Sequence, residues 1–359
     1  MDLSKKIIIN GKELKVPTVL SPMAGVTDLP FRRLIRELSK NQMGMLVSEF
    51  VSTDSCEAEH LKKRKQVFFY EEERPFGIQI FGRDSEKMAK AAYELQKLNP
   101  DFIEVNAGCP VPKVAGKGGG AGLLKDLKKL GQILKEVKKN ISVPLSLKCR
   151  IGWDASTVNI LETLAIAESE NVNWLTIHGR TRMEGYRGLA NWELIGEMAE
   201  KSKIPVIGNG DIVSAAIALE KLTKYNVSAI SIGRGALHNP WIFLQIAEAL
   251  KGNPVHRIES ETAMEAFRIY YRFMSETAPS ESCVLGRLKQ LTARLCKGLN
   301  PEFPEFRQEL LTSESIPDFF SRLDFFCVHE AENFIFEPER LINLNGQKTN
   351  IIEFGNQFK

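Results

Sequence analysis

The segment Ile103-Glu-Val-Asn-Ala-Gly-Cys-Pro110 ends a short apolar run in an Asn, a Gly, a Cys and a Pro, and a basic, glycine-rich loop continues to Gly120. This pattern is typical of a strand that delivers side chains to the mouth of a parallel α/β barrel. Pro110 restricts Cys109 to extended backbone angles, and Gly108 leaves room for a flat ligand. The alternative is an inert cysteine at the end of a strand, because free cysteines are mostly buried.

Seven further β-rich runs accompany this strand, and the eight recur at intervals of roughly 25 to 40 residues, with amphipathic helical stretches between most of them. Eight such units predict an α/β fold, namely a closed (β/α)8 TIM barrel with its active site at the carboxyl ends of the strands. A doubly wound open sheet is the alternative, but eight regular units favour closure. The predicted strands are Val16–Met23, Met45–Phe50, Phe76–Phe81, Phe102–Ala107, Leu145–Arg150, Trp174–His178, Pro205–Gly208 and Ala229–Ile232.

Polar and apolar side chains alternate along the third to sixth of these strands. The apolar set should face the helices, so the polar set should point into the barrel. Near the strand ends this inward set contains Gln79, Asn106, Lys148 and His178. An unsatisfied buried polar group costs about 1–3 kcal/mol, so these side chains either bind a polar ligand or pair with one another. The pattern on four adjacent strands favours a ligand.

The last two strands end in similar segments, Ile207-Gly-Asn-Gly-Asp-Ile212 and Ile232-Gly-Arg-Gly-Ala-Leu237. Barrels frequently bind phosphate with the loops after these two strands, and Arg234 suits a phosphate. Glycines that only turn the chain are the competing interpretation. A phosphate here and polar groups on the other strands suit FMN lying across the mouth, with Lys148 offsetting negative charge on its reduced ring. No GxGxxG fingerprint follows the first strand, which argues against a Rossmann-type nicotinamide site.

Composition bounds the class of protein. The chain has 359 residues, of which 43% are hydrophobic and 26% charged, and its formal net charge is +3. These values are ordinary for a soluble globular enzyme. The six cysteines show no spacing suited to zinc or an iron–sulfur cluster, so we expect no metal. No signal peptide and no membrane-spanning run is evident, and we expect a cytoplasmic protein without membrane association.

Six motifs are together highly specific, although each alone is weak. They are Ser21-Pro-Met-Ala-Gly-Val-Thr-Asp28, Val105–Lys113, Lys148-Cys-Arg-Ile-Gly-Trp153, Ile177-His-Gly-Arg-Thr-Arg182, Gly208-Asn-Gly-Asp211 and Gly233-Arg-Gly235. With them the sequence resembles the tRNA-dihydrouridine synthases, flavin enzymes that reduce uridine in tRNA. The resemblance runs from Leu20 to Leu250 and more weakly to Phe325, and is greatest to the bacterial B-type branch. Glu104 departs from the family, where an Asp is usual.

The resemblance implies a role for each matching residue. Cys109 matches the proton donor that acts on C5 of the uracil while reduced flavin delivers hydride to C6. NADPH is the implied reductant, and Asn106 and Arg187 are candidates to hold the uracil edge. The Lys113–Gly122 loop is expected to fold over the base with its glycines as hinges. The implied FMN-binding residues are Pro22, Met23, Ala24, Gln79, Lys148, His178, Asn209, Gly210, Asp211, Gly233 and Arg234.

The pattern becomes wholly helical after Pro254. We expect an FMN-binding barrel over residues 1–250, a helical tRNA-binding bundle over 255–328 and a tail of unknown role over 329–359. The helix Cys283–Lys297 carries four basic residues and no acidic one, which makes it a candidate RNA contact, although a solvated helix face is the alternative. We expect a monomeric protein whose RNA binding is mostly electrostatic.

Three other functions compete with tRNA reduction. The first is a flavin-dependent barrel oxidoreductase that acts on a free pyrimidine-like small molecule, which the helical region and basic loops disfavour. The second is a phosphosugar aldolase or isomerase without flavin, in which Lys148 would form a Schiff base. The third is a catalytically silent RNA-binding protein, which the intact Cys109, Lys148 and phosphate loops disfavour.

Overall fold

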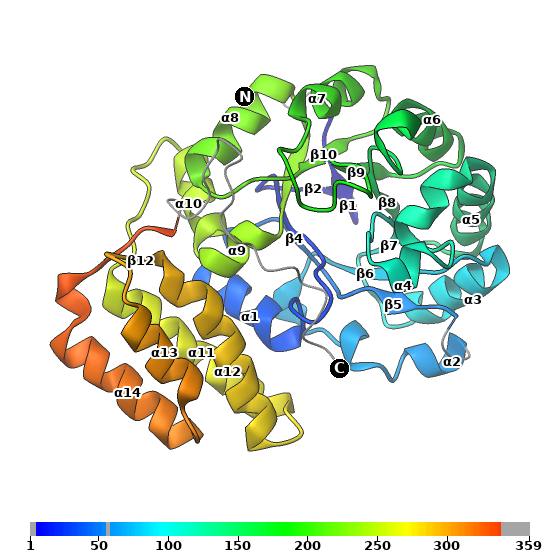
Figure 1. Cartoon of the computed structure of the whole chain (residues 1–359). Coiled ribbons are helices and arrows are strands. Elements are labelled where there is room, and N and C mark those ends of the chain that lie inside the picture. Colours follow the sequence, from blue (N-terminus) through cyan, green and yellow to red (C-terminus); the bar gives the residue numbers. More distant parts are fainter. Residues whose placement is uncertain (1–4, 55–57, 339–359) are drawn as a thin grey trace.

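The computed structural model describes residues 5–54 and 58–338. Eight parallel strands form a barrel surrounded by helices (Figure 1). Each strand pairs with the next around the ring, and pairing of Leu46 with Phe76 closes it. The predicted TIM barrel is therefore confirmed. Its strands are β3 (Thr18–Leu20), β4 (Met45–Val47), β6 (Phe76–Phe81), β7 (Phe102–Ala107), β8 (Leu145–Arg150), β9 (Trp174–His178), β10 (Val206–Asn209) and β11 (Ala229–Ile232).

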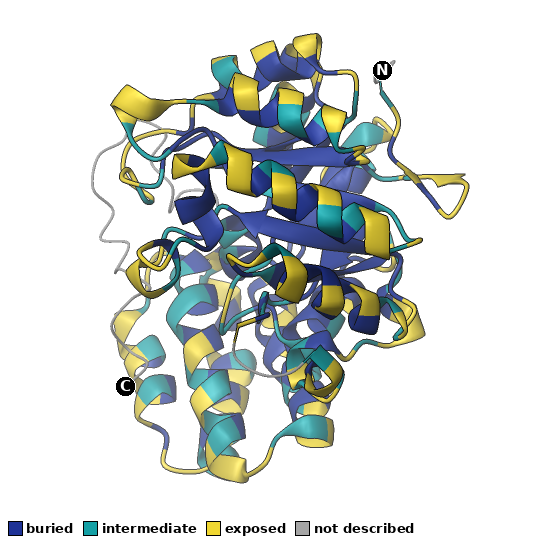
Figure 2. Ribbon diagram, turned by 90° about the vertical axis from the view of Figure 1, so that its right-hand side faces the viewer, coloured by how far each residue is buried: buried dark blue, intermediate teal, exposed yellow. Residues whose placement is uncertain are grey.

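The helices of the barrel bury one face and expose the other (Figure 2). Several begin where the sequence supplies an N-cap: the side chains of Asp84, Asp126 and Ser214 each accept a hydrogen bond from a backbone N–H of the first turn. The helices are α1 (Leu29–Leu38), α2 (Ala58–Leu61), α3 (Ser85–Gln96), α4 (Pro112–Ala115), α5 (Leu127–Asn140), α6 (Ile160–Ser169), α7 (Trp192–Lys201), α8 (Ala215–Tyr225), α9 (Arg234–His238) and α10 (Ile242–Leu250).

The predicted alternation of side chains divides the core. Outward residues of the strands, such as Ile78 and Leu147, pack with the helices in the larger apolar cluster. Inward residues at the amino ends of the strands, such as Phe102 and Trp174, form a second cluster that fills the bottom of the barrel. A short hairpin, β1 (Ile8–Ile9) and β2 (Lys12–Glu13), contributes to that bottom cluster. The polar inward residues are thereby confined to the opposite end, the mouth.

Four long helices form a group beside the barrel (Figure 1). They are α11 (Ser260–Thr277), α12 (Glu281–Leu295), α13 (Pro304–Thr312) and α14 (Ile316–His329), and a small ladder of β12 (Leu299–Asn300) and β13 (Ile335–Phe336) accompanies them. Helix α11 packs on α1 of the barrel, where the rings of Phe31 and Tyr270 meet edge to face with centroids 6.5 Å apart. We call residues 260–338 the helical domain.

The start of the predicted tail packs on the helical domain. Phe336 is buried, and Glu337 N donates to the carbonyl oxygen of Gly298 at 2.7 Å. The remainder of the predicted tail, residues 339–359, lies outside the described residues. Within residues 5–54 and 58–338, no helix combines the length and apolarity that crossing a membrane would require.

Candidate active site

Strand register brings the polar residues of the mouth together. Asn106 of β7 lies beside Lys148 of β8 in the parallel ladder. One level higher, Arg150 of β8 lies beside His178 of β9, which lies beside Asn209 of β10. Residues that are 28 or more positions apart in sequence thus become neighbours because parallel strands of a barrel present equivalent positions at the same height.

A chain of side-chain hydrogen bonds links strands β6, β7 and β8. Asn106 Nδ2 donates to Gln79 Oε1 at 2.8 Å, and Gln79 Nε2 donates to Glu104 Oε1 at 2.7 Å. Glu104 Oε2 accepts from Ser146 Oγ at 3.3 Å. Burial raises the pKa of the Glu104 carboxyl, and the Lys148 ammonium opposes that rise. Mutual pairing, the alternative to a ligand, therefore accounts for the contacts of Gln79 and Asn106 in this structure.

Lys148 reaches across β9 to strand β10. Its Nζ donates to Asn209 Oδ1 at 2.8 Å, and Asn209 Nδ2 donates to the carbonyl oxygen of Ser231 at 2.7 Å. Part of the Lys148 side chain is exposed, but desolvation of its amino group lowers its pKa to about 8. Burial and the nearby cations, led by Arg150, hold the pKa of His178 well below its ordinary value, so its imidazole is neutral at pH 7. Two groups with strongly lowered pKa values at one barrel mouth mark a candidate functional site.

Cys109 sits in a firmly held turn at the end of β7. Asn106 Oδ1 accepts from the backbone N–H groups of Gly108 and Cys109, at 3.0 and 2.9 Å. Ala121 N donates to the carbonyl oxygen of Cys109 at 3.1 Å. The side chain is buried, with 8% of its surface exposed, and burial raises the pKa of its thiol. The thiol therefore carries its proton at neutral pH, as a proton donor must.

The glycines of the following loop serve close packing. Gly120 has φ +53°, and a Cβ there would lie 3.0 Å from the Cβ of Cys109. A Cβ on Gly122 would lie 2.4 Å from the carbonyl oxygen of Ala115. These contacts explain both glycines without the hinge motion that we expected from the sequence. They also bring the loop against the backbone of the cysteine.

Arg150 ties the cysteine turn to a second loop. Its Nε donates to the carbonyl oxygen of Gly108 at 2.9 Å, and its Nη1 donates to the carbonyl oxygens of Thr181 and Gly185 at 2.8 and 2.9 Å. Its side chain is fully buried. Arg150 therefore joins the backbone next to Cys109 to the loop after β9.

The predicted phosphate end is built around two arginines. Arg180, which is buried, donates from Nη2 to both carboxylate oxygens of Asp211 at 2.8 Å. Arg234 Nη2 lies 3.3 Å from Asp211 Oδ1, and Ala190 N donates to Asp211 Oδ2 at 2.8 Å. Arg234 Nη1 is buried and has no hydrogen-bond partner among the described residues. Asp211 thus orients both arginines, while Arg234 retains a donor suited to an anion.

The turn after β10 explains one predicted glycine differently. Gly210 has φ +131°, and a Cβ there would lie 2.4 Å from the Cβ of Ala190. Asp211 follows with φ +56°. Gly210 is therefore required by the turn itself, which was the competing interpretation of this motif.

The loop after β3 completes this side of the mouth. Pro22 and Met23 are half-buried there, and Ala24 is exposed. A Cβ on Gly233 would lie 3.4 Å from Met23 Sδ, so the loops after β3 and β11 are in contact distance. The structure therefore places Pro22–Ala24 next to the Gly233–Arg234 segment, as the resemblance implies for one binding site.

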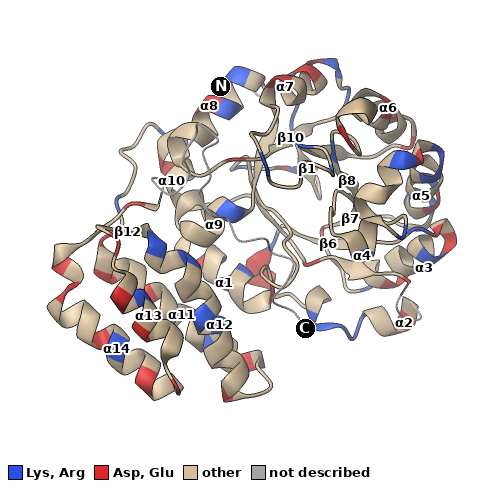
Figure 3. Ribbon diagram, in the orientation of Figure 1, with Lys and Arg blue, Asp and Glu red and all other residues tan. Residues whose placement is uncertain are grey.

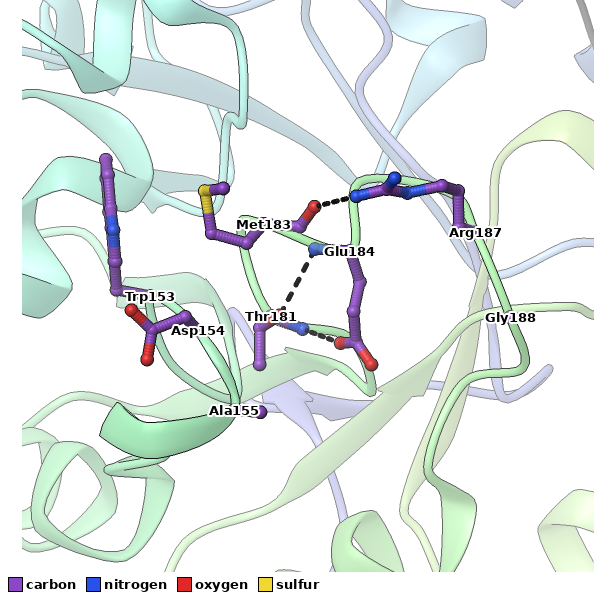
Figure 4. Close-up of a pocket in the computed structure, with 8 residues that line it drawn as sticks. All are labelled: Trp153, Asp154, Ala155, Thr181, Met183, Glu184, Arg187 and Gly188. Atoms are coloured by element: carbon purple, nitrogen blue, oxygen red, sulfur yellow. Dashed lines mark hydrogen bonds between the residues drawn. The ribbon is translucent and has the colours of Figure 1, made fainter.

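Arg187 contacts the backbone of its own loop. It is exposed on the loop after β9, and its Nη2 donates to the carbonyl oxygen of Met183 at 2.9 Å (Figure 4). It helps to line a surface pocket of about 550 Å³ with Trp153 and Glu184. Among the described residues, no hydrogen bond joins it to Asn106, its expected partner at the uracil edge.

Sequence reasoning did not single out three residues of this site. Arg150 and Arg180 donate hydrogen bonds to backbone carbonyl oxygens of the loop 181–188, and strand periodicity does not reveal such contacts. Tyr186 of that loop lies over the mouth: its ring centroid is 4.6 Å from the Arg234 guanidinium and 6.3 Å from the His178 ring. An inward-facing charge on β8 was the available signal for Arg150. Within the described residues, no cluster of three or more His, Cys, Asp or Glu could hold a metal ion.

The fold and site define the class of (β/α)8 barrel enzymes. The mouth of this barrel holds a buried thiol, a lysine of lowered pKa and an arginine with a buried N–H group that has no partner among the described residues and suits an anion. The dihydrouridine synthase family model matches residues 19–326. The chain belongs to the dihydrouridine synthase family, and the resemblance seen in the motifs is confirmed.

Similar proteins agree with this assignment. The chain is 41% identical to the tRNA-dihydrouridine synthase B of Pasteurella multocida, over 67% of this chain and 72% of that protein. It is 39% identical to the tRNA-dihydrouridine synthase B of Pseudomonas aeruginosa, over 65% of this chain and 69% of that protein. Among solved structures, a histamine dehydrogenase from Rhizobium sp. 4-9 shares the fold with a TM-score of 0.51 and 10% identity, over 76% of this chain and 51% of that one.

Proposed function

We propose that this protein reduces the C5=C6 bond of specific uridines in tRNA to give 5,6-dihydrouridine, with FMN as the resident cofactor and NADPH as the reductant. The observation that carries the proposal is the buried, protonated thiol of Cys109 in the turn after β7, the strand that pairs with β8 and its Lys148. Family membership and the names of the similar proteins support the substrate.

The residues at the mouth fit FMN. Arg234 Nη1 and Ser231 Oγ are buried polar atoms without partners among the described residues, and both belong to the segment around the end of β11. Such orphan atoms cost stability unless a ligand satisfies them. A phosphate is suited to Arg234 because a guanidinium binds phosphate oxygens directionally. Pro22–Ala24, Gly233 and Asn209 would then surround the cofactor, and Gln79 and Lys148 would bind its ring.

When bound, FMN supplies a hydride from N5 to C6 of the uracil. Cys109 then gives its proton to C5 from the opposite face, which is general acid catalysis. Asn106 keeps the thiol in place by holding the backbone of Gly108 and Cys109. When FMN is bound, Lys148 would offset negative charge at its reduced ring, and His178, whose imidazole is neutral, would contact the cofactor without adding charge.

A uridine in folded RNA must leave its stack to reach this mouth, which costs least in a loop. Basic residues stand on two sides of the opening: Lys113 and Lys117 follow β7, and Arg182 and Arg187 follow β9. We place the catalytic site in residues 1–250 and the main tRNA contact in the helical domain. Figure 3 shows basic residues along α12 of that domain.

Two measurements test this function. The visible spectrum of the purified full-length protein should show bound flavin, and tRNA from cells that lack the gene should gain dihydrouridine at defined positions when treated with protein and NADPH. Equal activity on free uridine would favour the small-molecule oxidoreductase. A colourless protein that cannot take up FMN would favour the aldolase or isomerase.

A further inference from the structure

Arg287 of α12 contacts the loop after β3 of the barrel, and most of its side chain is shielded from solvent. Arg287 Nη1 donates to the carbonyl oxygen of Gly25 at 2.6 Å, and its Nη2 forms an ion pair with Asp28. Only 17% of its side chain is exposed. Gly25 and Asp28 belong to the loop after β3. The helical domain therefore contacts a loop of the barrel directly. Arg287, one of the four basic residues of the helix expected to contact RNA, therefore binds the protein itself.

This loop carries the expected flavin residues Pro22, Met23 and Ala24, and the backbone N–H and C=O groups of the next residue, Gly25, are both hydrogen-bonded to side chains from elsewhere. Gly25 N donates to the carboxylate of Glu49, which follows β4, while the carbonyl oxygen of Gly25 accepts from Arg287. The loop's own turn is closed by Met23, whose carbonyl oxygen accepts from the N–H groups of Val26 and Thr27 at 3.0 Å. Arg287 thus holds the carbonyl group of Gly25, the residue after Ala24.

The charges around Arg287 make it hard to replace. Burial raises the pKa of the Glu49 carboxyl and the Asp28 carboxylate raises it further, whereas the hydrogen bond from Gly25 and the cations Arg287 and Arg32 lower it. The guanidinium therefore pairs with Asp28 and helps to offset Glu49, as well as holding a carbonyl oxygen. Without it, Asp28 would lose this ion-pair partner and Glu49 one of the two cations that lower its pKa.

A solvent-facing residue connects Arg287 to the outer surface of α12. Arg287 Nη1 also donates to Gln290 Oε1 at 2.8 Å, and Gln290 is exposed. Gly286, which precedes Arg287, is exposed too, and a Cβ there would meet nothing within 4 Å. A molecule bound on this face of α12 would contact the residue that orients Arg287.

We propose that Arg287 is a positioning residue that couples occupation of the helical domain by tRNA to the shape of the flavin-binding loop Ser21–Asp28. The proposal rests on the function proposed above. Coupling of this kind is reciprocal: if tRNA favours the loop conformation that binds FMN, then FMN favours tRNA binding by the same factor.

The interface offers a matched control. Arg272 of α11 forms an ion pair with Glu37, and Arg33 pairs with Glu276; both bridge the two parts of the molecule through α1 and not through the loop. Arg272→Gln therefore removes an ion pair between the same two parts while leaving Gly25 and Asp28 untouched.

The experiment measures the dissociation constant of unmodified tRNA with the FMN-loaded and the flavin-free full-length protein. We expect FMN to tighten tRNA binding about fivefold or more, the usual scale of such coupling, in the wild type and in Arg272→Gln. In Arg287→Gln the ratio should fall to near one, and Arg287→Lys, which keeps the charge, should recover part of it. Thermal unfolding of each variant shows whether it is folded.

The outcomes separate the two proposals. A wild-type ratio of one, or an unchanged ratio in folded Arg287→Gln, would overturn the coupling even if the wild type makes dihydrouridine. Equal loss of the ratio in Arg272→Gln would also overturn it, because any weakened interface would then suffice. Failure of the wild type to form dihydrouridine with FMN and NADPH would instead count against the proposed function.

Discussion

Asn106 holds Cys109 in place: the side-chain Oδ1 of Asn106 accepts a 2.9 Å hydrogen bond from the backbone N–H of Cys109. The other end of the same amide donates to Gln79. An inward-facing residue of β7 therefore links the thiol turn to the next strand of the barrel. This link explains how a cysteine on a loop keeps a constant position, which general acid catalysis requires.

Replacement of Cys109 by Ala should separate the two halves of the reaction. The flavin should still bind and still be reduced by NADPH, while dihydrouridine formation should slow by about 100-fold or more, the usual contribution of a general acid. Stopped-flow absorbance would follow flavin reduction, and mass spectrometry would follow the product. Cys109→Ser, which keeps a weaker donor, is the control. Product formed at the wild-type rate by the Ala variant would remove Cys109 from the mechanism.

Arg234 should recognise the phosphate of the cofactor, because its Nη1 has a buried donor and no partner among the described residues. Arg234→Gln should weaken FMN binding by about 10- to 100-fold, since hydrogen bonds to charged groups contribute about 1.5–3 kcal/mol. Riboflavin, which lacks the phosphate, should bind the wild type and the variant alike. Fluorescence titration measures both affinities. An equal loss for both ligands would place Arg234 elsewhere than at the phosphate.

The lowered pKa of Lys148 predicts that the reduction potential of the bound flavin depends on pH. Its pKa is lowered to about 8, so it is cationic below that pH and neutral above it. Beside the flavin ring proposed above, this cation would stabilise the anionic reduced form and so raise the midpoint potential. Lys148→Met should lower the potential by roughly 30–60 mV, that is one to two tenfold steps for a two-electron couple, below pH 8. At more alkaline pH the two proteins should converge.

Spectroelectrochemical titration from neutral to alkaline pH measures this difference. A gap between wild type and Lys148→Met that stayed constant across the whole range would contradict the assignment, and so would no gap at all.

Gly286 tests which face of α12 meets RNA. The position is exposed within a helix and has open space around it, so Gly286→Ala should stabilise the protein by about 0.5–1 kcal/mol in urea unfolding. Gly286→Glu places a negative charge on the same spot and should weaken tRNA binding about three- to tenfold, more strongly at low salt. The Ala variant is the matched control for the Glu variant. Equal tRNA affinity in both would move the contact away from this face.

The strands of the barrel could be predicted closely because each has a clear pattern and is bounded by turn residues. The first strand is an instructive exception. It was expected to extend to Met23, but β3 ends at Leu20 because the carbonyl oxygen of Met23 accepts from two following N–H groups and closes a turn. The second, expected to reach Phe50, likewise ends at Val47. A local turn thus overrides β propensity where a binding loop begins.

The candidate site was predicted in part for the same reason. Alternation placed Gln79, Asn106 and Lys148 inside the barrel, and the structure places them at the mouth. The roles of Arg150 and Arg180 were not visible, because their partners are backbone carbonyls of a distant loop. The contact of Arg287 with the loop after β3 could not be predicted either. A helical pattern shows that one face of a helix is basic, but it does not show which part of the protein that face contacts.

The most direct test is a single-turnover measurement under anaerobic conditions. Full-length protein carrying FMN is reduced with NADPH, freed of excess nicotinamide and mixed with tRNA from cells that lack the gene. The account predicts that the flavin is reoxidised only when tRNA is present and that one dihydrouridine forms for each flavin reoxidised. Reoxidation without dihydrouridine, or the same rate with free uridine as with tRNA, would contradict it.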